Sequence, residues 1–190
     1  MPVLYIIAGP NGAGKTTAAY TILPEVINVR EYVNADEIAR GISPFNPEAI
    51  AIQAGKIMLH RIDYLLNKQV SFAIETTLTT ISYLKTIAKA KSSGYSVVLF
   101  YIWLNKPELA FERVKMRVKK GGHNIPEEVI ERRYYKGLSN LPKFISAVDD
   151  WYLYNNSEGY YTFIAKCVQN NSEISSLDIY NKIVSYGKEK

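Results

Sequence analysis

Residues 9–16 read Gly-Pro-Asn-Gly-Ala-Gly-Lys-Thr and match the phosphate-binding pattern G-x-x-x-x-G-K-[ST] at every fixed position. The apolar run Val3–Ala8 precedes them and a helical pattern follows, so the loop lies between a strand and a helix, as this motif requires. Its glycines allow backbone N–H groups to converge on phosphate oxygens, and the following helix directs its positive end at the same anion. The loop therefore predicts a nucleotide-binding α/β fold.

Every residue of this loop is assigned to nucleotide binding. Lys15 is predicted to contact the β- and γ-phosphates, the Thr16 hydroxyl to join the Mg²⁺ shell, and Thr17 to lie near the α-phosphate. The other loop residues supply backbone groups and are Gly9, Pro10, Asn11, Gly12, Ala13 and Gly14. The predicted cofactors are ATP and Mg²⁺.

Further strand patterns alternate with helical patterns along the chain. Three of them end near Asn34, at Glu75 and at Leu104, and another lies in Tyr160–Val168. This alternation predicts a three-layer P-loop kinase-like α/β fold, with a roughly five-stranded parallel sheet, in one domain spanning residues 1–190. Ligands of such sheets bind outside the carboxyl ends of the strands, so the residues after each strand are the candidates for function.

Composition limits the partners and the compartment. The net charge of +5 and the pI of about 9.1 favour anionic partners, which nucleotides satisfy without nucleic acid. A single cysteine, Cys167, excludes an internal disulfide and a cysteine-rich zinc site and fits a reducing cytoplasm. No apolar run is long enough to span a membrane, and the apolar N-terminus lacks a basic leader, so we expect a cytoplasmic protein without a membrane partner.

The motor and switch classes of P-loop protein need motifs that this sequence lacks. No L-S-G-G-Q-like segment occurs, and no Asp-Glu pair follows an apolar strand pattern. The guanine motif N-K-x-D has its nearest match in Leu104–Glu108, which carries glutamate in the fourth place. Transfer of a phosphoryl group to an acceptor is therefore the favoured chemistry.

Such a transfer needs a carboxylate at the acceptor. Asp36 follows the second strand, in "VNADEIAR", where its side chain is expected to face the γ-phosphate. A carboxylate there can orient the acceptor hydroxyl and take its proton. The alternative is that Asp36 only caps the helix that follows it.

Glu75 follows the third strand and is succeeded by small hydroxyl residues. We expect Glu75 to bind Mg²⁺ through water or to hold substrate hydroxyls, and Thr76, Thr77 and Thr79 to hydrogen-bond to the same acceptor. The alternative is that the threonines cap a helix.

The segment at about residues 111–135 is densely basic and is predicted to form a lid. Arg113, Arg117 and Lys120 share one helical face, Gly121–Gly122 interrupt that helix, and Pro126 begins the next. A helix–loop–helix of this kind can close over a triphosphate and supply a catalytic arginine, here Arg113 or Arg117. The alternative is a solvated basic face.

The sequence resembles the zeta-toxin family of P-loop kinases, and in particular its short single-domain branch, often called predicted ABC-type ATPases. The shared segments span about residues 4–157 and are "AGPNGAGKTT", "VNADEIAR", "QAGKIMLHRI", "FAIETTL", "RVKKGGHNIPEEVIERRY" and "NNS". The resemblance implies a P-loop kinase fold with a mobile lid. It also implies ATP-dependent phosphorylation of the 3′-hydroxyl of UDP-N-acetylglucosamine and an antitoxin partner.

The resemblance assigns roles to single residues. It places the catalytic base at Asp36, the phosphate-binding lysine at Lys15, the substrate glutamate at Glu75, and the first lid arginine at Arg113 or Arg117. The sequence departs from the family at Thr79, where the family has an arginine, and near His123, where the family has a second lid arginine.

The sequence thus predicts an ATP- and Mg²⁺-dependent kinase that phosphorylates a hydroxyl of a small molecule such as a nucleotide sugar. Two alternatives stay open. One is a polynucleotide 5′-hydroxyl kinase, which the basic charge permits. The other is a hydrolytic or regulatory ATP-binding module that needs no acceptor.

Overall fold

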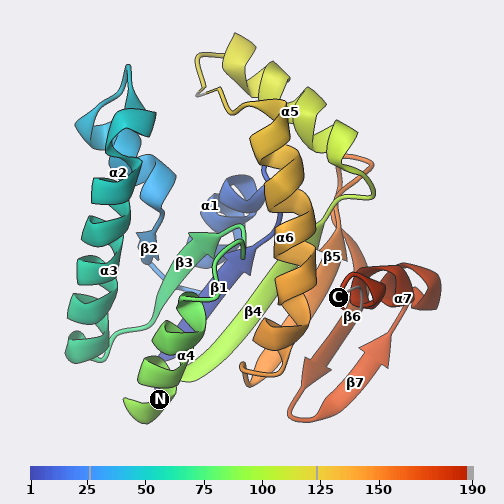
Figure 1. The fold of residues 1–190 in the computed structure, drawn as a ribbon. Coiled ribbons are helices and arrows are strands. Elements are labelled where there is room, and N and C mark those ends of the chain that lie inside the picture. The colour runs from blue at the N-terminus through green and yellow to red at the C-terminus, as the bar shows by residue number, and fades with distance from the viewer. Residues whose placement is uncertain (26, 123, 188–190) are drawn as a thin grey trace.

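The computed structural model of the chain describes residues 1–25, 27–122 and 124–187 and has a central sheet with helices on both faces (Figure 1). In chain order its elements are β1 Val3–Ala8, α1 Lys15–Glu25, β2 Glu31–Val33, α2 Ala35–Ile42, the 3-10 helix η1 Pro47–Ile50, α3 Ala51–Lys68, β3 Phe72–Thr76, α4 Tyr83–Ser92, β4 Ser96–Trp103, α5 Pro107–Lys119, α6 Glu127–Ile145, β5 Asp150–Asn155, β6 Thr162–Val168, β7 Asn171–Ile174 and α7 Leu177–Ser185.

The sheet has the strand order β2-β3-β1-β4-β5-β6-β7. Strands β2, β3, β1, β4 and β5 are parallel, whereas β6 and β7 join antiparallel. The three-layer α/β class is confirmed. The fifth parallel strand, however, is β5, and the segment predicted for that place forms the antiparallel β6. The turn from β6 to β7 passes through Gln169 and Asn170, both with positive φ, as a type I′ hairpin turn requires.

Helices α4 and α6 cover one face of the sheet, and α1 lies on the opposite face (Figure 1). The face of β1 that carries Leu4, Ile6 and Ala8 is fully inaccessible, and on the opposite face Ile7 is 4% exposed and Val3 and Tyr5 are half-buried. This explains why the first strand is a continuous apolar run in the sequence. Helices α2 and α3 lie beside the β2 edge (Figure 1).

The packing of β1 places the phosphate-binding loop at the middle of the sheet edge. Strand β1 pairs with β3 on one side and β4 on the other, with Ala8 opposite Thr76 and Tyr101. The loop therefore begins level with the ends of its neighbours. Gly9 has φ of 145°, and a Cβ there would overlap the carbonyl oxygen of Ile102, so glycine is required at this close approach.

Among residues 1–25, 27–122 and 124–187, we find no helix with the length and apolar character needed to cross a membrane.

Candidate active site

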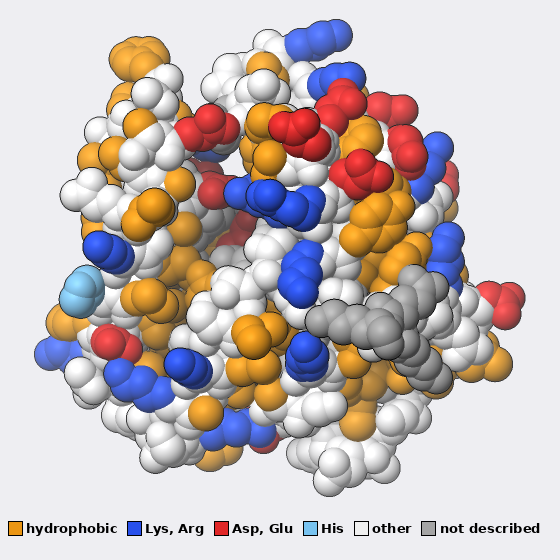
Figure 2. All heavy atoms as spheres, in the orientation of Figure 1, with side chains coloured by type: hydrophobic (Ala, Val, Ile, Leu, Met, Phe, Trp, Pro, Cys, Tyr) orange, Lys and Arg blue, Asp and Glu red, His pale blue; other side chains and the backbone are white. Residues whose placement is uncertain are grey.

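A cavity of about 470 Å³ lies at the carboxyl edge of the parallel strands. Figure 2 shows this face hollowed between α2 and α6, with acidic side chains inside and basic ones at the rim. The cavity is lined by Asn11, Gly12, Gly14, Lys15, Thr16, Thr17, Asn34, Ala35, Asp36, Glu37, Arg40, Glu75, Thr76, Thr77, Thr79, Thr80, Tyr83, Arg113, Arg117 and Arg133. The structure thus brings together all the predicted site residues except Gly9, Pro10 and Ala13, which belong to the backbone of the same loop.

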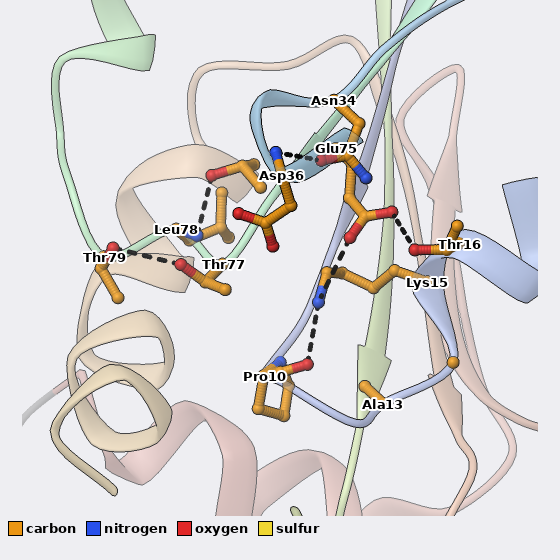
Figure 3. A network of polar contacts seen from close by, with 12 residues as sticks. Pro10, Ala13, Lys15, Thr16, Asn34, Asp36, Glu75, Thr77, Leu78 and Thr79 are labelled. Carbon is orange, nitrogen blue, oxygen red and sulfur yellow. Dashed lines mark hydrogen bonds and ion pairs between the residues drawn. The ribbon is translucent and has the colours of Figure 1, made fainter. Parts of the chain in front are cut away.

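Lys15 is held inside the phosphate-binding loop. Its side chain is 6% exposed, and its ammonium donates a hydrogen bond to the carbonyl oxygen of Pro10 at 2.9 Å. It also lies 3.7 Å from the Glu75 carboxylate (Figure 3). Burial lowers the pKa of Lys15, while the negative charges of Glu75 and Asp36 oppose that shift. The lysine thus lies beside the loop amides, where a bound anion would compensate its charge for the hydration lost on burial.

Residues beyond β5 brace the other side of the loop. The Asn156 side-chain amide donates to the carbonyl oxygen of Ala13 at 2.8 Å, and the Tyr161 hydroxyl donates to that of Gly14 at 2.8 Å. Neither residue was predicted to belong to the site. The available signal was the Asn155–Ser157 segment, at the end of a strand that the sequence pattern did not reveal.

The two candidate arginines of α5 have different surroundings. The Arg113 guanidinium donates to the carbonyl oxygens of Gly12 at 3.3 Å, Asn156 at 2.6 Å and Ser157 at 3.1 Å. Arg117 lines the cavity, and its positive charge contributes to lowering the pKa of Lys15. Both are therefore next to the phosphate-binding loop, with Arg113 joining it to the segment after β5.

Asp36 is not the helix cap. Helix α2 is capped by Asn34, whose side-chain oxygen accepts a hydrogen bond from the Asp36 backbone N–H at 2.8 Å. The cap interpretation of Asp36 is therefore wrong, because Asn34 performs that role. The Asp36 side chain is exposed, and its carboxylate is directed into the space between Lys15 and Thr77 (Figure 3). Burial raises the pKa of Tyr83 in the same cavity, and the charge of Asp36 adds to that rise.

Glu75 is turned toward the phosphate-binding loop. Its Oε2 accepts a hydrogen bond from the Thr16 hydroxyl at 2.8 Å (Figure 3). It accepts another from the hydroxyl of Tyr32, a residue that was not predicted to belong to the site. Thr16 and Glu75 offer oxygen atoms side by side, which is the donor type that Mg²⁺ takes when phosphates and water complete its shell. The donor set therefore fits a nucleotide-bound Mg²⁺. In the part of the chain that the structure describes, no group of three or more His, Cys, Asp or Glu is arranged to hold a metal ion.

The threonines after β3 form a tight turn. The Thr76 hydroxyl accepts a hydrogen bond from the Leu78 backbone N–H at 3.1 Å, and the Thr77 and Thr79 hydroxyls are hydrogen-bonded to each other at 3.1 Å. Helix α4 begins only at Tyr83, with Ser82 at its N-cap position and no side-chain cap hydrogen bond, so the interpretation of these threonines as helix caps is wrong. All three threonines line the cavity, and the hydroxyl of Thr76 supports the turn.

Helix α6 fixes this turn from outside. The Asn140 side chain donates to the carbonyl oxygen of Leu78 at 2.8 Å. Leu78 is buried with φ of 56°, a strained conformation for a leucine. Gly137 approaches so closely that a Cβ there would overlap the carbonyl oxygen of Thr77. The side of the cavity that carries Thr77 and Thr79 is thus built on a helix that follows it by about sixty residues in the chain, as the separation of 62 between Asn140 and Leu78 shows.

We expect Gly137→Ala to destabilise the protein by about 2 kcal/mol, because the added methyl group meets a backbone atom that cannot move alone. Gly55→Ala is the matched control, since Gly55 also lies in a helix and a Cβ there meets nothing within 4 Å. That control should gain about 0.5–1 kcal/mol from helix propensity. Urea unfolding of both variants measures the difference, and equal stabilities would contradict the close packing of α6 on the turn.

A second cavity of about 470 Å³ opens between α2 and α5. Its lining residues are Arg40, Arg113, Met116, Arg117, Lys120, Gly121 and Gly122. Arg40, Arg113 and Arg117 also line the first cavity, so the two cavities are neighbours. The predicted lid helix α5 borders this opening, and closure of the lid stays a prediction. Position 123, where the resemblance placed a second lid residue, lies outside the described residues.

Comparison with known proteins finds a matching family model and a related protein. Residues 1–162 match the family model described as Zeta toxin. A protein of Haemophilus influenzae described as uncharacterized is 33% identical over 126 residues, which are 66% of this chain and 88% of that protein.

Solved structures share the fold. The AvrRxo1-ORF1:-ORF2 complex with ATP has a TM-score of 0.80 at 18% identity, covering 98% of this chain. The present chain spans 64% of the length of the matched chain in that complex. The PezAT chromosomal toxin-antitoxin system of Streptococcus pneumoniae has a TM-score of 0.67 at 18% identity, covering 100% of this chain and 88% of the matched one. At these identities the structures show a common fold.

Proposed function

Because the chain belongs to the zeta toxin family, we propose that it is an ATP- and Mg²⁺-dependent phosphotransferase that acts on a hydroxyl group of a small molecule. The observation that carries the proposal is the arrangement of Lys15 and Asp36, which line one cavity from two different helices. Lys15 begins α1 after the phosphate-binding loop, and Asp36 lies in the first turn of α2 (Figure 3). A donor phosphate at Lys15 would face an acceptor hydroxyl at Asp36.

The donor half follows from the loop. Backbone N–H groups and the N-terminus of α1 are suited to the phosphates of ATP, and Lys15 would leave the carbonyl oxygen of Pro10 to contact them. Mg²⁺, held by Thr16 with support from Glu75, would supply charge neutralisation between the phosphates. Arg113 and Arg117 stand beside this half and are proposed to stabilise the charge of the group in transfer.

The acceptor half is proposed to lie between Asp36, Thr77 and Thr79. The Asp36 carboxylate would accept the hydrogen bond of the attacking hydroxyl and then take its proton, while the two threonine hydroxyls would bind other hydroxyls of the acceptor. The rim carries the positive charges of Arg40, Lys120 and the α5 arginines, with Arg40 paired to Glu37 at 3.2 Å, and among the described residues no carboxylate lines the second cavity. These features favour an acceptor that itself carries phosphate, such as a nucleotide sugar.

Arg40→Gln should raise the KM for a phosphorylated acceptor about fivefold and leave kcat unchanged, because Arg40 faces the opening from α2 and would contact the acceptor in the ground and transition states alike. The effect is modest since the side chain is 44% exposed, where an ion pair contributes about 1 kcal/mol. Lys89→Gln, which removes an exposed cation from α4, is the control. A fivefold fall in kcat with unchanged KM would contradict this role.

We further propose that the chain is one domain working in the cytoplasm, where ATP is available, and that an antitoxin protein holds it in check. The support is the family together with the PezAT structure, which is that of a toxin-antitoxin system. Growth arrest on expression of the wild-type chain but not of Asp36→Asn would support a toxic kinase. Arrest by both would separate toxicity from phosphoryl transfer.

The proposed reaction is tested by incubation with γ-labelled ATP and three classes of acceptor: nucleotide sugars, nucleosides and short oligonucleotides. Label is expected in the nucleotide sugars. Labelling of oligonucleotides, with binding that weakens steeply as salt rises, would instead identify a polynucleotide kinase. ATP turnover that no acceptor changes would identify a hydrolytic or regulatory module.

A further inference from the structure

Tyr32 connects the two halves of the cavity through an unbroken series of hydrogen bonds. The Asn34 side-chain nitrogen donates to the Tyr32 hydroxyl oxygen at 3.1 Å, and the Tyr32 hydroxyl donates to Glu75. The other end of the Asn34 amide accepts from the Asp36 backbone N–H. The same asparagine therefore sets the start of the helix that carries Asp36 and the direction of the hydroxyl that reaches Glu75.

The Tyr32 hydroxyl can act only as a donor toward Glu75. The Asn34 side-chain amide donates to the Tyr32 oxygen, so the hydroxyl proton is left to be directed at the Glu75 carboxylate. A carboxylate that receives such a hydrogen bond is fixed in rotation.

Glu75 has three partners, and nucleotide binding would change two of them. Lys15 would move its charge to the phosphates, and the Thr16 hydroxyl oxygen would turn to the metal. Of the three partners, Tyr32 is the one that would bind neither the phosphates nor the metal. It is therefore the contact that can keep Glu75 on the side of the phosphate-binding loop throughout the reaction.

We propose that Tyr32 is a positioning residue that holds the Glu75 carboxylate beside Thr16, so that Glu75 serves the Mg²⁺ of bound ATP and not the acceptor. This inference rests on the proposed function and deepens it, because it names the contact that keeps Glu75 on the metal side of the site. The acceptor pocket then keeps Asp36, Thr77 and Thr79 as its polar groups.

The test measures binding of a fluorescent ATP analogue by the full chain, with Mg²⁺ varied and with Mg²⁺ removed by EDTA. Tyr32→Phe keeps the ring and deletes the donor. We expect it to raise the Mg²⁺ concentration for half-maximal enhancement of nucleotide binding about tenfold. The affinity in EDTA should stay within twofold of wild type. Tyr20→Phe is the matched control, because Tyr20 packs edge-on against the Tyr32 ring but is 62% exposed.

A second pair of variants separates positioning from a change in packing. Glu75→Gln should shift the Mg²⁺ dependence in the same direction, and the double variant with Tyr32→Phe should lose little more than Glu75→Gln alone. Additive losses, equal losses with and without Mg²⁺, or an unchanged Mg²⁺ dependence would each overturn the inference. So would a raised acceptor KM with normal Mg²⁺ dependence, which would return Glu75 to the acceptor. Failure of the wild-type chain to bind the nucleotide at all would instead contradict the proposed function itself.

Discussion

Replacement of Asp36 by asparagine is expected to lower the rate of phosphoryl transfer about a thousandfold while changing ATP affinity only a few-fold. General base catalysis by a positioned carboxylate contributes about 10²–10⁴-fold, and the amide cannot take the acceptor's proton. The fold should be unaffected, because the Asp36 side chain is exposed and its backbone N–H keeps its bond to Asn34. Single-turnover transfer and equilibrium ATP binding measure the two quantities separately.

The control for this variant is Asp63→Asn, which neutralises an exposed carboxylate of α3 that pairs with Lys89 away from the cavity. It should transfer phosphate at the wild-type rate. Transfer by Asp36→Asn at a rate near that of wild type would remove Asp36 from the mechanism and leave the cavity without its proposed base.

Lys15→Met should remove both tight ATP binding and catalysis. Methionine fills the volume of the lysine stem but carries no charge to the phosphates, and loss of such a stabilising group costs about 10²–10³-fold in kcat. ATP affinity should fall by at least tenfold in addition, because Lys15 would contact the phosphates in the ground state too. The measurements are ATP binding by calorimetry and kcat/KM at saturating acceptor.

Stability must be measured beside activity for this variant, since Lys15 is buried and paired with Glu75. Glu75 would keep its hydrogen bonds from Thr16 and Tyr32, so we expect the folded state to persist. Lys89→Met, at an exposed ion pair of α4, is the matched control. A folded Lys15→Met protein with ATP affinity like that of wild type would contradict the assignment of the loop.

Local sequence signals predicted the parts of the fold that short segments determine. The phosphate-binding loop and the strand before it were predictable because glycine conformation, apolar burial and helix start all act within residues 3–16. Strand β5 was missed because its apolar residues alternate only as Trp151 and Leu153 between half-buried tyrosines, directly after a long helix. Strand β7 was missed because all four of its residues are exposed and three of them are polar. Only its pairing with β6 defines it as a strand.

The same distinction holds for the site. The positions of Lys15, Asp36 and Glu75 at strand ends followed from the alternation of strands and helices. The direction of the Glu75 carboxylate did not, because it depends on Tyr32 and Thr16 from two other elements. The supports from Asn156 and Gly137 were likewise invisible, since each acts across more than fifty residues of chain, as the separation of 143 between Asn156 and Ala13 illustrates.

The number of phosphoryl groups transferred per ATP consumed tests the central claim most directly. The wild-type chain is incubated with ATP, Mg²⁺ and the acceptor panel, and the phosphorylated acceptor, ADP and free phosphate are quantified together. Our account predicts one phosphorylated hydroxyl for each ADP formed, and neither product above background with Asp36→Asn. ADP and free phosphate formed in equal amounts, at one rate with every acceptor and with none, would contradict it.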